Sequence, residues 1–204
     1  MLRLHYFPPM CSLASMTALE IAGAEYEPVL HDMTGDRAAL RAISPLGQIP
    51  VLETSDAVIT DTIAIIYWIA HAFPKAQLLP IDPAALTAAL SKMAWLGSYL
   101  HVVRRRYARP QLFGVPDEAI EQMRSVARPI YWTGLSRLET WIADGVLGGT
   151  GVEAYALLFY HWATVDGLPV AELDHFSALA KRMAETPGIR RALQLHDSPL
   201  IAAT

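Results

Sequence analysis

The amino-acid sequence predicts two structural units in one chain: a small α/β unit with a mixed β-sheet, followed by an all-helical unit. Residues 2–71 carry strand-like and helix-like patterns in the order β-α-β-α-β-β-α, whereas only helical spacing of apolar residues follows Pro83. Prolines at positions 74, 80 and 83 separate the two patterns, as is typical of a linker. We therefore expect one domain at residues 1–75, a linker at 76–83 and a helical domain at 84–204.

Local patterns predict each element of the α/β unit. Residues 2–6 alternate apolar and polar side chains, which indicates a half-buried strand. Residues 11–23 repeat apolar side chains at helical spacing and end at Gly23, a residue that commonly stops helices. Helical crossovers make neighbouring strands parallel and a hairpin makes them antiparallel, so we expect a mixed four-stranded sheet. The remaining elements are expected as strands at 26–31, 49–53 and 57–59, a short helix ending at Ile43, and a helix at 60–71.

The second unit is predicted to be a bundle of helices. Apolar residues after Pro83 form one helical stripe that runs toward residue 108. Thr150 and Glu153 have the spacing of a reciprocal capping box, so a helix is expected to begin there. Further helical patterns cover residues 116–141, 150–165 and 173–185.

Composition excludes several classes of protein. Of the 204 residues, 53% are hydrophobic and 18% charged, and the mean hydropathy is +0.27. The longest apolar run, Ile63–Ala70, is far shorter than the span of about 20 residues that a bilayer-crossing helix needs. Pro8 and Pro9 interrupt the N-terminus too early for a signal peptide. A net charge of −4 argues against general nucleic-acid binding, which needs a cationic face.

A single cysteine, Cys11, excludes an intrachain disulfide and a multi-cysteine zinc site, and it is typical of a reducing cytosol. The seven histidines show no metal-ligand spacing with carboxylates. We therefore expect a cytoplasmic protein that holds no metal and associates with neither membrane nor nucleic acid.

Cys11 lies after the first predicted strand, at the N-terminus of the first predicted helix. A thiol at a helix N-terminus faces unpaired N–H groups and the positive end of the helix dipole, which favour the thiolate. Ser12 beside it has a hydroxyl that can donate to a sulfur anion, either that of Cys11 or that of a bound thiol. The alternative is that Cys11 is a small buried apolar residue, as most free cysteines are.

Two other segments each have a structural and a functional interpretation. A cis bond between Ile49 and Pro50 would turn the Ile49 backbone toward an extended ligand, although only about 5–6% of X–Pro bonds in folded proteins are cis. Asp61 and Thr62 stand at the head of the helix at 60–71, where both residue types cap helices well. The same position binds a carboxylate through helix N–H groups, with Asp61 accepting from an ammonium group.

Five stretches in chain order carry a family pattern: Tyr6–Ser15 with its cysteine, Ser44–Leu52 with its proline, Thr60–Ile65, Thr150–Tyr155 and Met183–Pro187. Together they resemble the bacterial beta-class glutathione transferases over nearly the whole chain. The resemblance implies the glutathione transferase fold, with a thioredoxin-like N-terminal domain and an all-helical C-terminal domain. It also implies glutathione as a co-substrate.

The resemblance assigns residues to the binding of glutathione. It implies a cis Ile49–Pro50 bond, with Gln48, Ile49 and Pro50 on the cysteinyl part of the tripeptide. It implies that Asp61 and Thr62 hold the γ-glutamyl end.

The resemblance also assigns catalytic positions. It implies that Cys11 lies beside the glutathione sulfur, where it can form a mixed disulfide, and that His101 reaches the same sulfur. With Ser12, these are the candidate catalytic residues. The electrophilic co-substrate is expected between the domains, near Met10, His101 and Arg105.

The chain departs from the family pattern at several places. Met10 follows Pro9 where the family usually has Gly-Ala, Asp61 replaces a glutamate and Thr62 a serine, and Val102 stands where a lysine often follows the histidine. No lysine matches the one expected near the glycine carboxylate of glutathione. The candidates to replace it are His31, Arg37 and Arg41.

The sequence therefore predicts a cytoplasmic glutathione transferase that conjugates small hydrophobic electrophiles, as in detoxification. Two alternatives remain: glutathione-dependent thiol–disulfide exchange or peroxide reduction through Cys11, and a catalytically silent binding protein of the same fold. Because exposed apolar patches mark interfaces, the surplus of apolar residues predicts a homodimer.

Overall fold

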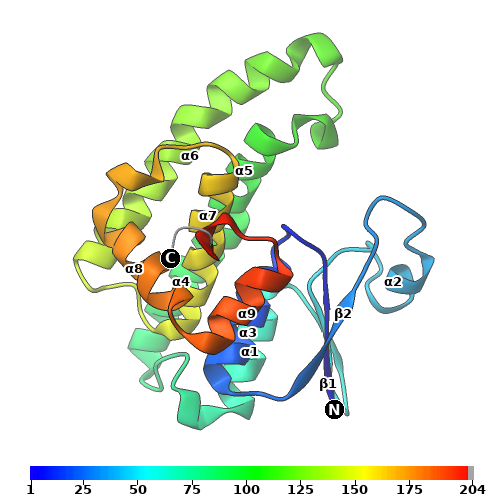
Figure 1. Ribbon diagram of the computed structural model, residues 1–204, viewed down its shortest axis with the longest axis vertical. Coiled ribbons are helices and arrows are strands. Elements are labelled where there is room, and N and C mark those ends of the chain that lie inside the picture. Colours follow the sequence, from blue (N-terminus) through cyan, green and yellow to red (C-terminus); the bar gives the residue numbers. More distant parts are fainter. Residues whose placement is uncertain (202–204) are drawn as a thin grey trace.

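The structure is a computed structural model that describes residues 1–201, and it shows a four-stranded sheet with its helices followed by helices alone (Figure 1). In chain order, the elements of the first part are β1 (Leu2–Tyr6), α1 (Ser12–Ala22), β2 (Tyr26–Leu30), α2 (Ala38–Ile43), β3 (Val51–Glu53), β4 (Val58–Thr60) and α3 (Thr62–Ala72). Each predicted element is present, with ends within two residues of those expected from the sequence.

The sheet is mixed, as predicted. Its strand order is β2-β1-β3-β4, and β1 runs parallel to β2, with Leu2 opposite Tyr26 and Tyr6 opposite Leu30. The pairs β1–β3 and β3–β4 are antiparallel. Helices α1 and α3 cover one face of this sheet and α2 lies on the other side (Figure 1). The C-terminal end of β1 and the N-terminal end of β3 therefore lie side by side. The loop before α1 and the loop before β3 meet at this edge of the unit.

The second part is entirely helical within the described residues. Its elements are α4 (Pro83–Trp95), a π-helical turn (Leu96–Leu100), α5 (His101–Ala108), α6 (Ile120–Ala143), α7 (Thr150–Val165), α8 (Asp174–Ala184) and α9 (Pro187–Leu195). The predicted stripe toward residue 108 is helical throughout but includes the π-helical turn, a feature frequently found at functional sites. Helix α9 has no counterpart among the helices predicted from periodicity. Over residues 1–201, no helix combines the length and the apolar character needed to cross a bilayer.

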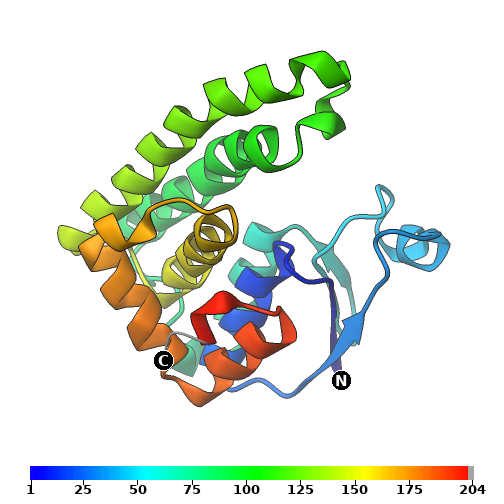
Figure 2. The same ribbon diagram turned by 45° about the horizontal axis from the view of Figure 1, so that its top comes forward.

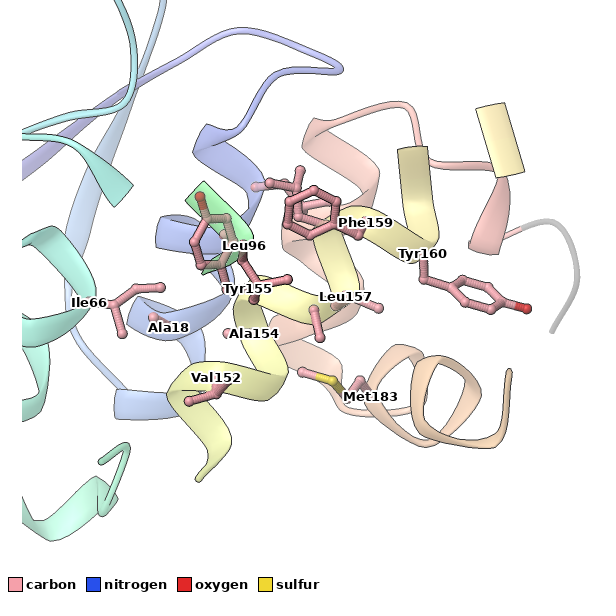
Figure 3. Packing of buried hydrophobic residues seen from close by; sticks show 14 of the residues in the cluster. Ala18, Ile66, Leu96, Val152, Ala154, Tyr155, Leu157, Phe159, Tyr160 and Met183 are labelled. Carbon is pink, nitrogen blue, oxygen red and sulfur yellow. The ribbon is translucent and has the colours of Figure 1, made fainter. Parts of the chain in front are cut away.

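Helix α7 lies at the centre of the molecule, with the other helices and the sheet unit around it (Figure 2). From Gly151 to Ala163 all of its residues except Glu153 are buried. Its side chains join one core with Ala18 of α1, Ile66 of α3 and Met183 of α8 (Figure 3). One continuous core therefore serves both halves of the chain, and the domain boundaries at residues 75 and 84 stay a prediction.

The start of α7 corrects one expectation. The helix does begin at Thr150, but the reciprocal capping box is wrong. The cap position is Gly149, the Thr150 hydroxyl is buried without a partner among residues 1–201, and Glu153 pairs with Arg182. The reason is a close approach of two backbones. Gly149 has φ +121°, and a Cβ there would lie 2.8 Å from the Leu78 oxygen, which also accepts a hydrogen bond from the Gly151 N–H.

Candidate functional site

A cavity of about 660 Å³ opens between the sheet unit and helices α4, α5 and α7. The loop before β3, the head of α3 and the turn before α5 each contribute side chains to its wall. Every residue that the resemblance assigns to glutathione lines this cavity, together with two of the three candidate catalytic residues: Gln48, Ile49, Pro50, Asp61, Thr62, Cys11 and His101. The fold thus gathers residues that lie up to 90 positions apart in the sequence.

The Ile49–Pro50 peptide bond is cis, as the resemblance implies and against the general preference of X–Pro bonds. Pro50 directly precedes β3, and Ile49 lies outside the strand pairs of the sheet. The backbone of Ile49 is therefore placed to pair with an extended ligand. A second cis bond, Pro8–Pro9, lies in the loop that leads to Cys11 and was not predicted.

Asp61 caps α3, because its Oδ1 accepts a hydrogen bond from the Ile63 N–H at 3.0 Å. The structural interpretation of this residue is therefore confirmed. Asp61 also lines the cavity, and its backbone has φ +76° and ψ 133°, a conformation that costs a residue other than glycine about 1–3 kcal/mol and that clusters at ligand sites. Its exposed carboxylate is available to a cation in the cavity, while Thr62 beside it is buried.

Cys11 occupies the cap position of α1, and its thiol donates a hydrogen bond to the Ile49 carbonyl oxygen, with 3.2 Å between Sγ and O. Burial raises the pKa of this thiol to about 11, and the negative charge of Asp61 acts in the same direction. The backbone N–H of Cys11, the charge of Arg105 and the Thr62 hydroxyl lower it, together by less. The expectation that the helix N-terminus makes Cys11 a thiolate is therefore wrong, because desolvation outweighs the favourable groups around it.

Ser12 does not reach the cavity. It is fully buried in the first turn of α1, where its Oγ accepts a hydrogen bond from the Phe7 N–H at 3.4 Å. This contact ties the helix to the preceding loop. The structure therefore gives Ser12 a place behind Cys11 and not beside a bound thiol.

His101 begins α5 directly after the π-helical turn and lines the cavity. Its ring lies 4.9 Å from that of Trp162. Burial and the positive charges of Arg105 and Arg104 lower the pKa of this imidazole to about 4, so it is neutral at neutral pH. A neutral ring in this position offers one N–H donor and one acceptor nitrogen for hydrogen bonds to a thiol or thiolate in the cavity.

A second cavity, of about 370 Å³, adjoins the first and shares four lining residues with it, Cys11, Gln48, Ile49 and His101. Met10 and Arg105, which the sequence assigns to the co-substrate, both line it. The loop that carries Met10 is fixed from the helical half: the indole N–H of Trp162 on α7 donates to the Pro9 carbonyl oxygen at 2.6 Å.

Only one of the three candidates for the glycine carboxylate of glutathione remains available. His31 is hydrogen-bonded to His5 at 2.6 Å, and Arg41 is paired with Asp36 at 2.8 Å. Arg37 lines the second cavity and makes only a 3.3 Å hydrogen bond to the Gly47 oxygen.

No three His, Cys, Asp or Glu side chains of residues 1–201 are grouped to hold a metal ion, and the absence of a metal stays a prediction.

Sequence reasoning missed several residues of the larger cavity, among them Tyr155 of α7 and Gly97 of the π-helical turn. A Cβ at Gly97 would lie 3.2 Å from the Tyr155 hydroxyl oxygen, so the glycine lets this hydroxyl approach. The signal that was present is a glycine inside an apolar helical stripe, which costs helix stability and marks a close approach.

Comparison with known proteins agrees with this geometry. Residues 2–71 match the family model of the glutathione S-transferase N-terminal domain. The chain is 28% identical over 200 residues to glutathione S-transferase GstA of Escherichia coli O157:H7, covering 94% of this chain and 97% of the relative.

Solved structures give the same result over the full length. A glutathione transferase homolog from Sulfitobacter with bound glutathione superposes with a TM-score of 0.87 at 27% identity, covering 95% of this chain and 97% of the other. The beta-class glutathione S-transferase of Sphingomonas chungbukensis superposes with a TM-score of 0.80 at 26% identity, covering 95% and 98%. Sequence, fold and the placement of the cavity residues therefore agree: residues 2–71 match a glutathione S-transferase N-terminal domain, and the chain is similar to glutathione S-transferases over nearly its whole length.

Proposed function

We propose that this protein binds glutathione in the larger cavity and transfers the glutathione thiolate to small hydrophobic electrophiles in the second. One observation carries the proposal: the two cavities meet at Cys11, Gln48, Ile49 and His101, so that a thiol held in one faces a molecule held in the other. The glutathione bound to the Sulfitobacter homolog supports the tripeptide as the ligand.

The residues that line the two cavities offer a partner to each part of glutathione. The backbone of Ile49 pairs with the cysteinyl residue, and the first N–H groups of α3 with the Thr62 hydroxyl bind the γ-glutamyl carboxylate. The Asp61 carboxylate accepts from the γ-glutamyl ammonium group, and Arg37 binds the glycine carboxylate. Held at both ends, the tripeptide presents its sulfur to the wall shared by the two cavities.

The groups near that sulfur favour its ionised form. The ring N–H of neutral His101 donates a hydrogen bond to the sulfur while the thiol proton leaves to solvent, and the positive charge of Arg105 stabilises the resulting thiolate. The thiolate then attacks an electrophilic carbon, forming a C–S bond as the bond to a leaving group breaks. Positioning both reactants in adjoining cavities lowers the entropic cost of their encounter.

The protonated state of Cys11 favours transfer over thiol–disulfide exchange. A thiol whose pKa is about 11 is a poor nucleophile at neutral pH, because the thiolate is the reacting species. In transfer chemistry the nucleophile is the sulfur of glutathione, and Cys11 serves only as a neighbour.

Conjugation of 1-chloro-2,4-dinitrobenzene and glutathione-dependent reduction of a mixed disulfide separate the alternatives. We expect conjugation to persist in Cys11→Ala and to fall at least tenfold in His101→Ala. Loss of disulfide reduction in Cys11→Ala, without conjugation in the wild type, would establish the exchange enzyme instead. Absence of any heat on titrating glutathione into the protein would exclude both enzymes and leave a silent binding protein.

We also propose a cytoplasmic homodimer with a role in detoxification. Large apolar side chains are exposed on β4, α3 and the π-helical turn, namely Val58, Tyr67 and Tyr99, and the first two of these elements are in contact with each other. Light scattering is expected to give twice the monomer mass of 22.4 kDa and the monomer mass for Tyr67→Glu. A monomeric wild type at micromolar concentration would contradict the dimer.

A further inference from the structure

The second cavity is lined by arginines without any carboxylate among the residues of its wall. Arg37, Arg104, Arg105 and Arg109 contribute to it, whereas no Asp or Glu does. This positive lining stands out in a chain whose net charge is −4. The rest of the wall is largely apolar, formed in part by Met10, Met33, Leu112 and Trp162.

An ion pair neutralises the charge of Arg104, so this residue contributes to the cavity wall without offering a charge to a ligand. Its guanidinium donates to both carboxylate oxygens of Asp166, at 2.9 and 3.0 Å, and stacks over the Trp162 ring at 4.4 Å. Both partners of this ion pair are buried. A buried bidentate pair of this kind holds its geometry and leaves no charge for a ligand.

Arg105 and Arg109 differ from Arg104, because neither has a carboxylate partner among residues 1–201. Both side chains are partly buried. Burial and the positive charges of Arg104 and Arg105 lower the pKa of Arg109, and the negative charge of Asp166 opposes this only in part, so the cluster repels itself when the cavity holds no anion. A ligand with a negative charge relieves this repulsion.

Glutathione does not use up this charge. The groups that bind its two ends line the larger cavity, except Arg37, and neither Arg105 nor Arg109 belongs to that cavity. Arg37 suffices for the glycine carboxylate, and Arg105 acts on the sulfurs near Cys11, whose pKa it lowers. Arg109 is left facing the space that receives the co-substrate.

We propose that the second cavity selects electrophiles that carry a carboxylate, which Arg109 binds with help from Arg105 while the apolar body of the molecule lies against Met10 and Leu112. The planar guanidinium fork matches a carboxylate with two parallel hydrogen bonds. The inference rests on the proposed transferase function and narrows its substrates from hydrophobic electrophiles in general to anionic ones.

A matched pair of electrophiles tests the inference: 4-chloro-3-nitrobenzoate and its methyl ester. Each kcat/KM is divided by the rate constant of the same compound with glutathione alone at the same pH, which removes the difference in intrinsic reactivity. We expect the normalised ratio of acid to ester to exceed ten for the wild type and to fall at least tenfold in Arg109→Gln. Arg106→Gln is the control, because Arg106 is on the same helix but exposed and lies over Phe113, outside this cavity; it is expected to keep the wild-type ratio.

The outcomes separate this inference from the function on which it rests. Conjugation of the ester with a normalised ratio of one or below overturns the carboxylate preference and leaves the transferase in place. A weaker binding of glutathione to Arg109→Gln by calorimetry, with an unchanged ratio, assigns the arginine to the tripeptide and also overturns the inference. Failure to conjugate either compound, together with no heat from glutathione, overturns both proposals.

Discussion

The Cys11 thiol donates a hydrogen bond to the carbonyl oxygen of Ile49, the residue whose backbone we propose to pair with the cysteinyl part of glutathione. The bond joins the cap of α1 to the loop before β3, two segments that are 38 residues apart. It holds the thiol at the wall of the cavity, where burial keeps the thiol protonated. The protein thus holds a neutral hydrogen-bond donor, and not an anion, where the glutathione thiolate is expected to lie.

The pKa of Cys11 predicts slow alkylation of the native protein. With a pKa of about 11, the thiolate fraction rises tenfold for each pH unit between 7 and 10. The rate of modification by iodoacetamide, followed by intact mass, is expected to rise accordingly. The protein in urea serves as the control, because exposure returns the thiol to its ordinary pKa and the rate then levels off near pH 9. A plateau below pH 8 in the native protein would show that the thiolate is favoured after all.

Asp61→Asn separates the two roles of this residue. Asparagine caps helices as well as aspartate and tolerates positive φ, so the free energy of unfolding is expected to change by less than about 0.5 kcal/mol. The substitution removes the charge that faces the γ-glutamyl ammonium group, and the Kd for glutathione is expected to rise about tenfold, the size of effect of a lost charge-assisted hydrogen bond. Urea unfolding and calorimetry measure the two quantities. An unchanged Kd would limit Asp61 to capping.

Gly134→Ala is expected to destabilise the packing of α6 against the π-helical turn. A Cβ at Gly134 would lie 2.3 Å from Cδ1 of Leu100, which is fully buried and has little room to move. Overpacking of this kind costs about 1–3 kcal/mol, even though alanine favours the helix. Thr133→Ala, at the exposed neighbouring position, is the control and is expected to change the unfolding free energy by less than about 0.5 kcal/mol. Equal stability of Gly134→Ala and the wild type in urea would contradict the close contact.

Buried histidines make the fold sensitive to acid. Burial lowers the pKa of His161 to about 4 and that of His196 to about 3. The charge of Arg104 adds to the effect on His161, and His161 adds to the effect on His196. The unfolded chain binds protons on these rings from about pH 6.5 downward, whereas the folded chain does not until pH 3–4. Stability is therefore expected to be fully present above pH 6.5 and to fall as the pH drops through this window.

His196→Leu tests that source of acid sensitivity. Both ring nitrogens of His196 are buried without a partner among residues 1–201, so an apolar side chain of similar size removes an unpaired polar group. We expect stability at pH 7 to be no lower than that of the wild type. The slope of unfolding free energy against pH between 6 and 5 is expected to fall by about 1.4 kcal/mol per pH unit, the contribution of one proton. An unchanged slope in urea titrations would assign the sensitivity to other groups.

Local patterns predicted most of the fold because the physical signals are local. The alternation in residues 2–6, the glycine at position 23 and the proline at position 50 each act within a few residues, and the structure places a strand, a helix end and a strand start there. The capping box at Thr150 failed because a distant backbone, that of Leu78, fixes the start of the helix.

The site was predictable only in part, because its electrostatics depend on long-range packing. The resemblance brought Cys11, Ile49, Asp61 and His101 to one cavity correctly. It gave no basis for the protonated state of Cys11, which follows from burial. The charge that Arg109 offers to a ligand could not be predicted from the sequence either. It depends on which of the neighbouring arginines pairs with Asp166, and that partner, Arg104, is 62 residues away in the sequence.

The hydrogen bond from Trp162 to the Pro9 oxygen has a consequence for modularity. It joins residues 153 positions apart, and it fixes the loop that carries Met10 and Cys11 from the central helix of the other half. A fragment cut at the linker loses this anchor along with the α7 side of the shared core. We therefore expect that the α/β unit does not work as an independent glutathione-binding module. Without the helical half, as in a fusion protein, it lacks the helix that fixes the loop of Met10 and Cys11.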